Sequence, residues 1–418
     1  MPRSDVPTPA RERQAEHLRR THRIRTVPRP LVGGGGSFEL SYTRTGPVSA
    51  TPLLVFPGGP GLGSVLPYAG FRRRAERMGL DVIMIEHRGV GLSRTSANGI
   101  DIARSEIQLA AVHADAAAVF DAERVERAIP YGTSYGSTVA LGFGARHPER
   151  VAAMVLDSAS LGASSVQAAS RALHDLYWDA LVPSTHALAL RVRALADRGF
   201  LQHPSAGFVF QLLHEFGGPP AVARYLSLLE QGRGRNFSAW ATRIGKTELS
   251  RVVPFHMEFD LVGEIAFREL NYGGTSDTGR GPAPDTDPLD LSGQFDAFSG
   301  SFSAFEAPGV DFADALPSFR WPTVVISGER DIRTPRSVSE RIVTRAPGAV
   351  LLPVRDHGHS ALDMQQSLAL RVMRAVATGL ADSGGVAVRL PSEARGKPGI
   401  VGRMLALRLA AATLPFAR

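Results

Sequence analysis

The sequence predicts an α/β protein: a mostly parallel sheet with helices on both faces, interrupted by an inserted helical cap. Short, continuously apolar segments alternate with helical patterns, which is typical of parallel strands buried on both faces. The alternation stops at Asp157 and resumes at Thr323, so the mostly helical residues 158–318 separate two parts of one sheet domain. Such sheets bind ligands at the carboxyl ends of their strands, and we expect the insertion to lie over that edge.

The predicted elements follow in order along the chain. Apolar Phe38, Leu40 and Tyr42 alternate with polar neighbours, which predicts a half-buried strand from Ser37 to Thr43. Apolar runs predict buried strands at residues 53–56, 82–85, 128–131, 151–156, 323–326 and 350–352. Helical patterns predict helices at residues 68–78, 106–120 (with Ser105 as the N-cap), 135–146, 169–181, 187–196 and 361–378.

These elements divide the chain into five segments. They are a polar N-terminal extension (1–22), two parts of the α/β core (23–157 and 319–383), the helical cap (158–318) and a basic C-terminal tail (384–418). A patch rich in Gly, Ser, Asp and Pro at residues 273–288 predicts a loop inside the cap. Apolar and basic residues mix within 400–416, which predicts an amphipathic helix docked on the core. A subunit contact or a membrane-surface element is the alternative.

Composition narrows the classes of function. Of 47 basic residues all but Lys246 and Lys397 are arginine, and they are scattered, so the formal charge of +7 does not predict a nucleic-acid partner. The absence of cysteine excludes disulfides, thiolate metal sites and a cysteine nucleophile. Residues 1–20 lack the apolar stretch of a secretory signal, and no apolar run is long enough to span a membrane. We expect a cytoplasmic protein with no cofactor, no metal and no stable membrane insertion; the oligomeric state is not predicted.

The segment Gly132-Thr133-Ser134-Tyr135-Gly136 carries the strongest chemical signal. It follows a predicted strand and opens a predicted helix, the setting of a nucleophile elbow, in which a strained turn presents a serine at the top of the sheet. Small residues two positions to either side avoid a clash, and the helix N-terminus favours negative charge. The alternative is a small-residue turn in a Rossmann-like sheet. We predict Ser134 as the nucleophile of an α/β-hydrolase fold.

A serine nucleophile needs a base, and the base needs an orienting acid; in this fold they follow in the order Ser, acid, His. Asp331 lies just past the predicted strand 323–326 and is the expected acid, with Glu329 as the fallback. The base lies in the segment 356–360, which offers two histidines. We favour His359, because a glycine precedes it and a serine follows it; His357 is the alternative.

An acyl-transfer site also needs two backbone N–H groups aimed at the developing oxyanion. One is expected from Tyr135, the residue after the nucleophile. The other is expected from the loop after the strand 53–56, which reads Phe56-Pro57-Gly58-Gly59-Pro60-Gly61. Its glycines allow the backbone to approach a substrate carbonyl, and Gly59 is the predicted donor.

Three motifs together resemble those of the proline iminopeptidase and tripeptidyl aminopeptidase branch of α/β-hydrolases, peptidase family S33. They are Gly58-Gly59-Pro60-Gly61, Glu86-His87-Arg88-Gly89-Val90-Gly91-Leu92-Ser93 and Gly132-Thr133-Ser134-Tyr135-Gly136-Ser137. The resemblance covers residues 53–156 and 323–362. Pro57 stands where the family usually has His, and Glu86 where it usually has Asp. The resemblance implies release of an N-terminal residue from a peptide, with a helical cap over the site.

In this family acidic cap residues recognise the free α-ammonium group of the substrate. Arg268-Glu269-Leu270-Asn271-Tyr272 is similar to a cap segment of the longer proline iminopeptidases, which points to Glu269, with Glu264 and Glu258 as alternatives. A solvated helix glutamate is the competing interpretation. The expected substrate is therefore a small peptide. The alternative function is an esterase, amidase or biosynthetic acyl-transfer hydrolase that acts on a small non-peptidic acyl substrate.

Overall fold

The computed structural model describes residues 8–201, 205–250, 252–272, 288–289, 291, 298, 300–383, 394–396 and 399–413. In this part of the chain nine strands form one sheet in the order β1-β2-β4-β3-β5-β6-β7-β8-β9. The pairs β1–β2 and β2–β4 are antiparallel, and the others are parallel. The strands are β1 (Ile24–Pro30), β2 (Ser37–Thr45), β3 (Leu53–Phe56), β4 (Val82–Ile85), β5 (Ile129–Thr133), β6 (Met154–Asp157), β7 (Thr323–Gly328), β8 (Ala349–Arg355) and β9 (Ala394–Arg395).

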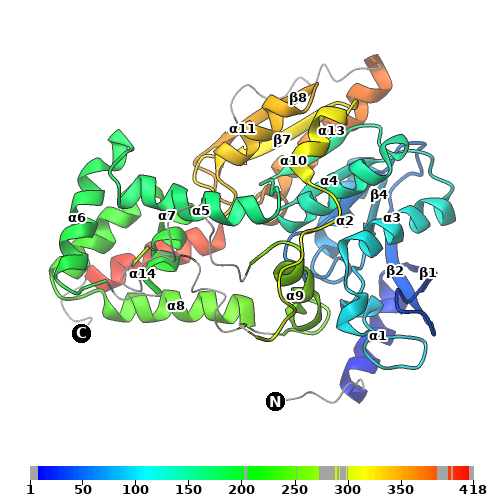
Figure 1. The fold of residues 1–418 in the computed structure, drawn as a ribbon, viewed down its shortest axis with the longest axis horizontal. Helices are drawn as coiled ribbons and strands as arrows, with labels where there is room; N and C mark the ends of the chain where they lie inside the picture. Colours follow the sequence, from blue (N-terminus) through cyan, green and yellow to red (C-terminus); the bar gives the residue numbers. More distant parts are fainter. Residues whose placement is uncertain are drawn as a thin grey trace.

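Helices cover both faces of the sheet (Figure 1). Alternate residues of β3 show the division: Leu53 and Val55 pack with α2 and α13, whereas Leu54 and Phe56 pack with α3, α4 and α11. Burial on both faces explains why the central strands are continuous apolar runs, and the predicted α/β class is confirmed. These helices are α2 (Ala69–Arg77), α3 (Leu109–Glu123), α4 (Tyr135–Arg146), α11 (Arg336–Arg345), α12 (Ala361–Met364) and α13 (Gln366–Ser383).

The insertion between β6 and β7 is mainly helical where it is described. Its helices are α5 (Ala163–Tyr177), α6 (His186–Asp197), α7 (Ser205–Glu230), α8 (Arg235–Ser250), α9 (Phe259–Arg268) and α10 (Phe312–Ala315). Helices α5 to α8 share an apolar cluster of their own, to one side of the sheet (Figure 1). Helix α7 changes direction at Gly218, before Pro219 and Pro220. Helix α9 instead packs Val262 and Ile265 into the apolar core beside the sheet.

Several predicted boundaries are wrong. The helix predicted from residue 106 with Ser105 as its N-cap begins at Leu109, and residues 104–106 form a 3-10 turn. The cause is tertiary, because the Glu106 carboxylate accepts hydrogen bonds from the N–H groups of Val32 and Gly33. Strand β6 begins later than residue 151, α5 begins and ends earlier than the predicted 169–181, and the predicted helix 361–378 is interrupted between α12 and α13.

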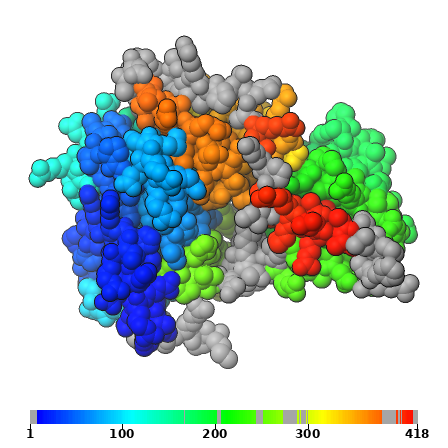
Figure 2. All heavy atoms as spheres, turned by 180° about the vertical axis from the view of Figure 1, so that it is seen from behind, coloured from blue at the N-terminus to red at the C-terminus, as the bar shows by residue number. Residues whose placement is uncertain are grey.

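Both terminal segments contain helices. Helix α1 (Pro9–Thr21) and strand β1 were not predicted; α1 buries Leu18 against the sheet domain. Helix α14 (Ile400–Thr413) was predicted to dock on the core but buries Leu405 and Leu409 among the cap helices, where Figure 2 shows it in red against green. Most of the predicted loop 273–288 and residues 414–418 lie outside the described residues.

In the part of the chain that the structure describes, no helix has the length and apolarity needed to cross a membrane.

Candidate active site

Ser134 occupies a strained turn between β5 and α4. Its φ of 53° and ψ of −123° lie outside the regions that L-residues normally adopt. The turn brings backbone into van der Waals contact at both flanking glycines. A Cβ on Gly132 would collide with the carbonyl of Gly136, and a Cβ on Gly136 would collide with the carbonyl of Phe56. The two glycines are therefore required by the packing of the elbow against β3.

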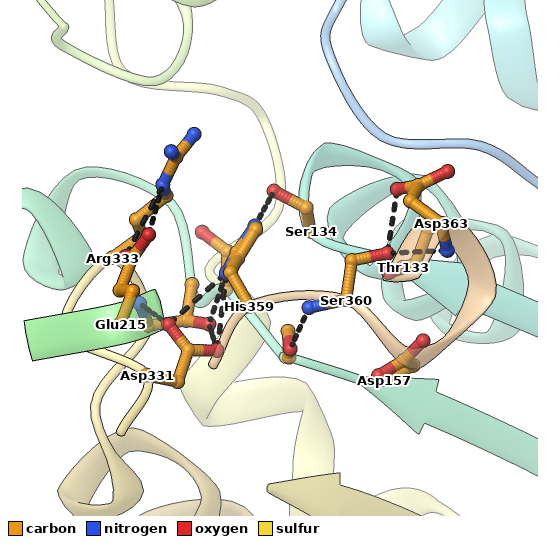
Figure 3. A network of polar contacts seen from close by, with 12 residues as sticks. Thr133, Ser134, Asp157, Glu215, Asp331, Arg333, His359, Ser360 and Asp363 are labelled. Atoms are coloured by element: carbon orange, nitrogen blue, oxygen red, sulfur yellow. Dashed lines mark hydrogen bonds and ion pairs between the residues drawn. The ribbon is translucent and has the colours of Figure 1, made fainter. Parts of the chain in front are cut away.

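The serine, the histidine and the aspartate form one continuous hydrogen-bonded line (Figure 3). Ser134 Oγ lies 2.9 Å from Nε2 of His359, and His359 Nδ1 lies 3.0 Å from each carboxylate oxygen of Asp331. The three side chains come from the ends of β5, β7 and β8, which lie at the same edge of the sheet. The structure thus brings together the three residues that the sequence singles out for the triad.

The electrostatics of this line follow from burial and charge. The Asp331 side chain is fully buried and also accepts hydrogen bonds from Thr334 N–H (3.0 Å) and Thr334 Oγ1 (2.8 Å). Burial alone would raise the pKa of Asp331, but His359 and these donors hold it below its ordinary value. Burial lowers the pKa of His359, and the charge of Asp331 more than offsets this, so the pKa lies above its ordinary value.

The alternatives for base and acid lie outside this hydrogen-bonded line. His357 is buried, and its Nε2 has no hydrogen-bond partner among the described residues. Burial lowers the pKa of His357, which favours a neutral ring. Glu329 accepts a hydrogen bond from the Asp356 N–H (3.0 Å) on an exposed turn. Neither His357 nor Glu329 has a hydrogen bond to a triad side chain.

A second network ties the histidine loop to the elbow (Figure 3). The N–H of Ser360 donates to Ser158 Oγ (2.8 Å), and Thr133 Oγ1 donates to Ser360 Oγ (3.0 Å). The Asp157 carboxylate, at the end of β6, accepts from the N–H groups of Ala361 (3.0 Å) and Leu362 (2.9 Å). These bonds fix the residues on the C-terminal side of His359 to the ends of β6 and of β5, the strand that leads into Ser134. Thr133 and Ser360 belong to the sequence motifs that predict the elbow and the base, whereas the supporting roles of Asp157 and Ser158 were not predicted.

The loop after β3 lies directly against Ser134. A Cβ built on Gly58 would be 3.4 Å from Ser134 Cβ, and Gly59 has a φ of 120°, which glycine adopts readily. Tyr135 is the first residue of α4, where a backbone N–H has no intrahelical acceptor. The Tyr135 hydroxyl lies 2.8 Å from Nε2 of His87. Both predicted oxyanion donors therefore belong to segments that adjoin Ser134.

The three predicted cap glutamates have different partners. Glu269 pairs with Arg268 (3.0 Å) and accepts from the Leu109 N–H (3.1 Å). Together with burial, the charge of Glu269 raises the pKa of the Tyr135 hydroxyl far above its ordinary value. Glu264 also pairs with Arg268 (3.5 Å), whereas Glu258 pairs with Arg11 of the N-terminal helix. Of the three, Glu269 is the one whose charge acts on a residue adjoining Ser134.

Another acidic residue of this region, Glu215 on α7, was not predicted from the sequence. Its side chain is 1% exposed and its two carboxylate oxygens each lie 3.2 Å from Nε of Arg333 (Figure 3). Burial raises the pKa of Glu215 despite this partner. Glu215 and His359 line a cavity of about 340 Å³ between the cap and the sheet domain. In the sequence, Glu215 and the neighbouring His214 are the ionisable residues between apolar Leu213 and Phe216. No group of three metal-ligating side chains occurs among the described residues.

Comparisons with known proteins agree with this architecture. Residues 51–184 match the family described as the alpha/beta hydrolase fold. The chain has the α/β-hydrolase fold, with a mostly parallel sheet, a strained turn at Ser134 after β5 and a helical insertion after β6.

The chain is similar in structure to several solved hydrolases, at low sequence identity. One is a proline iminopeptidase from Mycobacterium smegmatis (16% identity, 84% of this chain and 98% of that chain, TM-score 0.47). Another is Est816, described as an N-acyl homoserine lactone degrading enzyme (19%, 81% and 96%, TM-score 0.45). A third is a thermophilic esterase from Thermogutta terrifontis (18%, 85% and 98%, TM-score 0.44). Likeness at this level does not identify a substrate.

Proposed function

We propose that the protein is a serine hydrolase that works through an acyl-enzyme on Ser134. The observation that carries the proposal is the unbroken line from Ser134 Oγ through His359 to Asp331, at distances of 2.9 and 3.0 Å. A hydroxyl is a weak nucleophile until a base accepts its proton. His359 Nε2 lies within hydrogen-bond reach of that proton, and Nδ1 of the same ring faces the carboxylate that fixes its tautomer.

The reaction follows from this arrangement. Ser134 Oγ bonds to the substrate carbonyl carbon as its proton passes to His359 Nε2. The carbonyl oxygen becomes an oxyanion that accepts hydrogen bonds from the N–H groups of Tyr135 and Gly59. When the carbon–nitrogen bond breaks, His359 gives its proton to the leaving amine. Water then attacks the ester carbon as His359 takes a proton from it. The bond between that carbon and Ser134 Oγ breaks, His359 returns the proton to Oγ, and the acid is released.

Within this class we propose an aminopeptidase that releases an N-terminal residue. In such a substrate the α-ammonium group and the reacting carbonyl are attached to the same carbon, so a carboxylate that recognises the ammonium must lie beside the oxyanion site. Glu269 is the candidate for this role, because burial and then the charge of Glu269 raise the pKa of the hydroxyl of Tyr135, the residue after Ser134. Glu264 and Glu269 share one guanidinium, that of Arg268. A substrate ammonium would supply a second positive group for the two carboxylates.

The experiment compares free-amine aminoacyl arylamides with N-blocked arylamides and a small neutral aryl ester. For a peptidase of this type, the free-amine substrates are turned over and the blocked ones are inert. Glu269→Gln retains the shape of the side chain and removes its charge. We expect kcat/KM for free-amine arylamides to fall roughly 10- to 100-fold, because a partly buried ammonium loses its partner. Turnover of the ester, which needs only the triad and the oxyanion donors, should change little.

Glu306→Gln is the matched control, because Glu306 is an exposed glutamate of the same insertion. It should leave both activities intact. Equal losses on ester and arylamide in Glu269→Gln would indicate damage to the fold instead of loss of recognition. Unchanged activity on both would remove Glu269 from the site. Strong ester turnover with inert free-amine arylamides in the native protein would favour the esterase or biosynthetic alternative.

A further inference from the structure

Arg11 links the N-terminal helix to the interior of the molecule. Its guanidinium pairs with the carboxylate of Glu258 through both terminal nitrogens and donates to the carbonyl of Gly91 (2.9 Å). It also lies over the ring of Phe255, 4.6 Å from the centroid. Figure 2 shows this N-terminal segment in dark blue beside the yellow-green segment around residue 260. Helix α1 is therefore fastened to the residues that precede α9.

Glu258 is completely buried, with 0% of its side chain exposed. One carboxylate oxygen accepts from the Gly91 N–H in the turn after β4. Its backbone N–H donates to the carbonyl of Gly61 (2.8 Å), in the loop that supplies the predicted oxyanion donor Gly59. Glu258 thus joins three segments that are distant in the sequence: α1, the turn after β4 and the oxyanion loop (residues 57–63).

The segment 253–258 packs tightly against the oxyanion loop. The N–H of Gly63 donates to the carbonyl of His256 (2.9 Å), and Leu62 forms a β-bridge with Met257. A Cβ built on Gly63 would be 2.6 Å from the carbonyl oxygen of Phe255, and one on Gly61 would be 3.0 Å from Glu258 backbone atoms. With so little space between them, a shift of the segment 253–258 must be transmitted to the loop.

The charges around Glu258 make Arg11 important for its position. A second buried carboxylate, Glu86, holds the C-terminal end of the loop by accepting from the N–H groups of Ser64 (2.6 Å) and Val65 (3.0 Å). Burial raises the pKa of Glu86 to about 7, and the charge of Glu258 adds to the effect. Arg94 approaches Glu258 only to 4.0 Å. Without Arg11, a buried carboxylate would lose its hydrogen-bonded guanidinium next to a like group.

We propose that helix α1 is a positioning element of the active site, in which Arg11 holds Glu258, and thereby the oxyanion loop, in register with Ser134. The inference rests on the proposed serine mechanism. Arg11 touches neither the triad nor the predicted oxyanion donors, so it is a positioning residue. Its loss should weaken stabilisation of the oxyanion, an interaction present in the transition state and absent when substrate first binds.

The test compares Arg11→Gln with Arg13→Gln, which removes the same charge from an exposed position on the same helix. We measure the rate of Ser134 labelling by a fluorophosphonate, the kcat and KM for a neutral aryl ester, and inhibition by an aryl boronic acid. Loss of one oxyanion donor costs about 10²- to 10³-fold, so we expect a displaced one in Arg11→Gln to lower kcat roughly 10- to 100-fold with little change in KM. Affinity for the boronic acid should fall in parallel, Arg11→Lys should recover part of the loss, and Arg13→Gln should resemble the native protein.

Native kcat in a folded Arg11→Gln, or equal losses in Arg11→Gln and Arg13→Gln, would overturn the inference. If Arg11→Gln fails to fold, the double variant Arg11→Gln/Glu258→Gln removes the unpaired buried charge. Low kcat with unchanged KM in that variant supports the positioning role, and native kcat contradicts it. If the fluorophosphonate does not label the native protein at all, the serine mechanism fails, and this inference fails with it.

Discussion

Replacing Asp331 by asparagine is the most direct perturbation of the proposed mechanism, because it changes one oxygen into an NH₂ group and leaves the shape unchanged. The fully buried carboxylate accepts from His359 Nδ1 (3.0 Å), Thr334 N–H (3.0 Å) and Thr334 Oγ1 (2.8 Å), and a hydrogen bond from the Ser158 side chain also helps to lower the pKa of Asp331. These neighbours present hydrogens to the side chain. An amide has only one accepting oxygen to offer to these donors.

The expected size of the effect follows from this mismatch. If the amide oxygen stays with Thr334, the NH₂ group faces His359 Nδ1. Nδ1 must then act as acceptor, and the ring proton moves to Nε2, 2.9 Å from Ser134 Oγ. A protonated Nε2 cannot take the serine proton. Asp331→Asn should therefore lower kcat about 10⁴-fold, or about 5 kcal/mol of transition-state stabilisation, with a small change in KM.

The pH dependence gives an independent test with a defined sign. Only neutral His359 can act as the base, so activity rises as pH increases through its pKa. Burial lowers that pKa and Asp331 raises it to a net value above the ordinary one, so the native protein should have its ascending limb above about pH 6.5. In Asp331→Asn burial remains and the negative charge is lost. The ascending limb of the residual activity should move to lower pH.

The assay is kcat/KM for a chromogenic ester between about pH 5 and pH 9. Circular dichroism and the unfolding midpoint show whether the variant is folded. Glu329→Gln is the matched control, because Glu329 follows the same strand and its carboxylate only accepts from the Asp356 N–H. It should retain native activity and the native pH profile. Activity of Asp331→Asn within tenfold of native would refute the role of Asp331.

Two further predictions concern the nucleophile and the base. Ser134→Ala should fold normally and lose nearly all turnover, and a fluorophosphonate followed by peptide mapping should label the native protein at Ser134; labelling elsewhere would contradict the assignment. His359→Ala should be as inactive as Ser134→Ala in the ester assay, whereas His357→Ala should keep substantial activity because His357 has no hydrogen bond to a triad residue. The reverse result would exchange the two histidines.

The α/β core was predictable because its signals are local. A parallel strand buried on both faces must be apolar at nearly every position, so β3 and β4 are visible as four-residue apolar runs with the observed boundaries. The elbow is visible as a short sequence motif, although its two glycines are required by different contacts: Gly132 by Gly136 within the turn, and Gly136 by Phe56 of β3. Helix starts were less predictable where a distant group competes for the backbone, as at Glu106, which is held by Val32 and Gly33.

Ion pairs between residues that are distant in the sequence could not be predicted in the same way. The sequence places Glu258, Glu264 and Glu269 within twelve positions of one another and offers each as an ammonium-binding residue. In the structure Arg268 forms ion pairs with Glu264 and Glu269. Glu258 instead pairs with Arg11, 247 positions away in the sequence. The residues near Glu258 in the sequence do not predict its pairing with Arg11, because this pairing depends on α1 lying against the start of α9.

Helix α1 was predicted as a polar extension because its main contacts are likewise with residues that are distant in the sequence. An isolated helix with many arginines and one buried leucine resembles a solvated segment, and its mean composition gives no reason to dock it. Besides the contacts of Leu18, one guanidinium of the helix pairs with a carboxylate that has no exposed surface. A buried charge is costly unless it is paired. The complete burial of Glu258 therefore makes the arginine on α1 a requirement of the site, which is why the proposed role of the helix can be tested at a single residue.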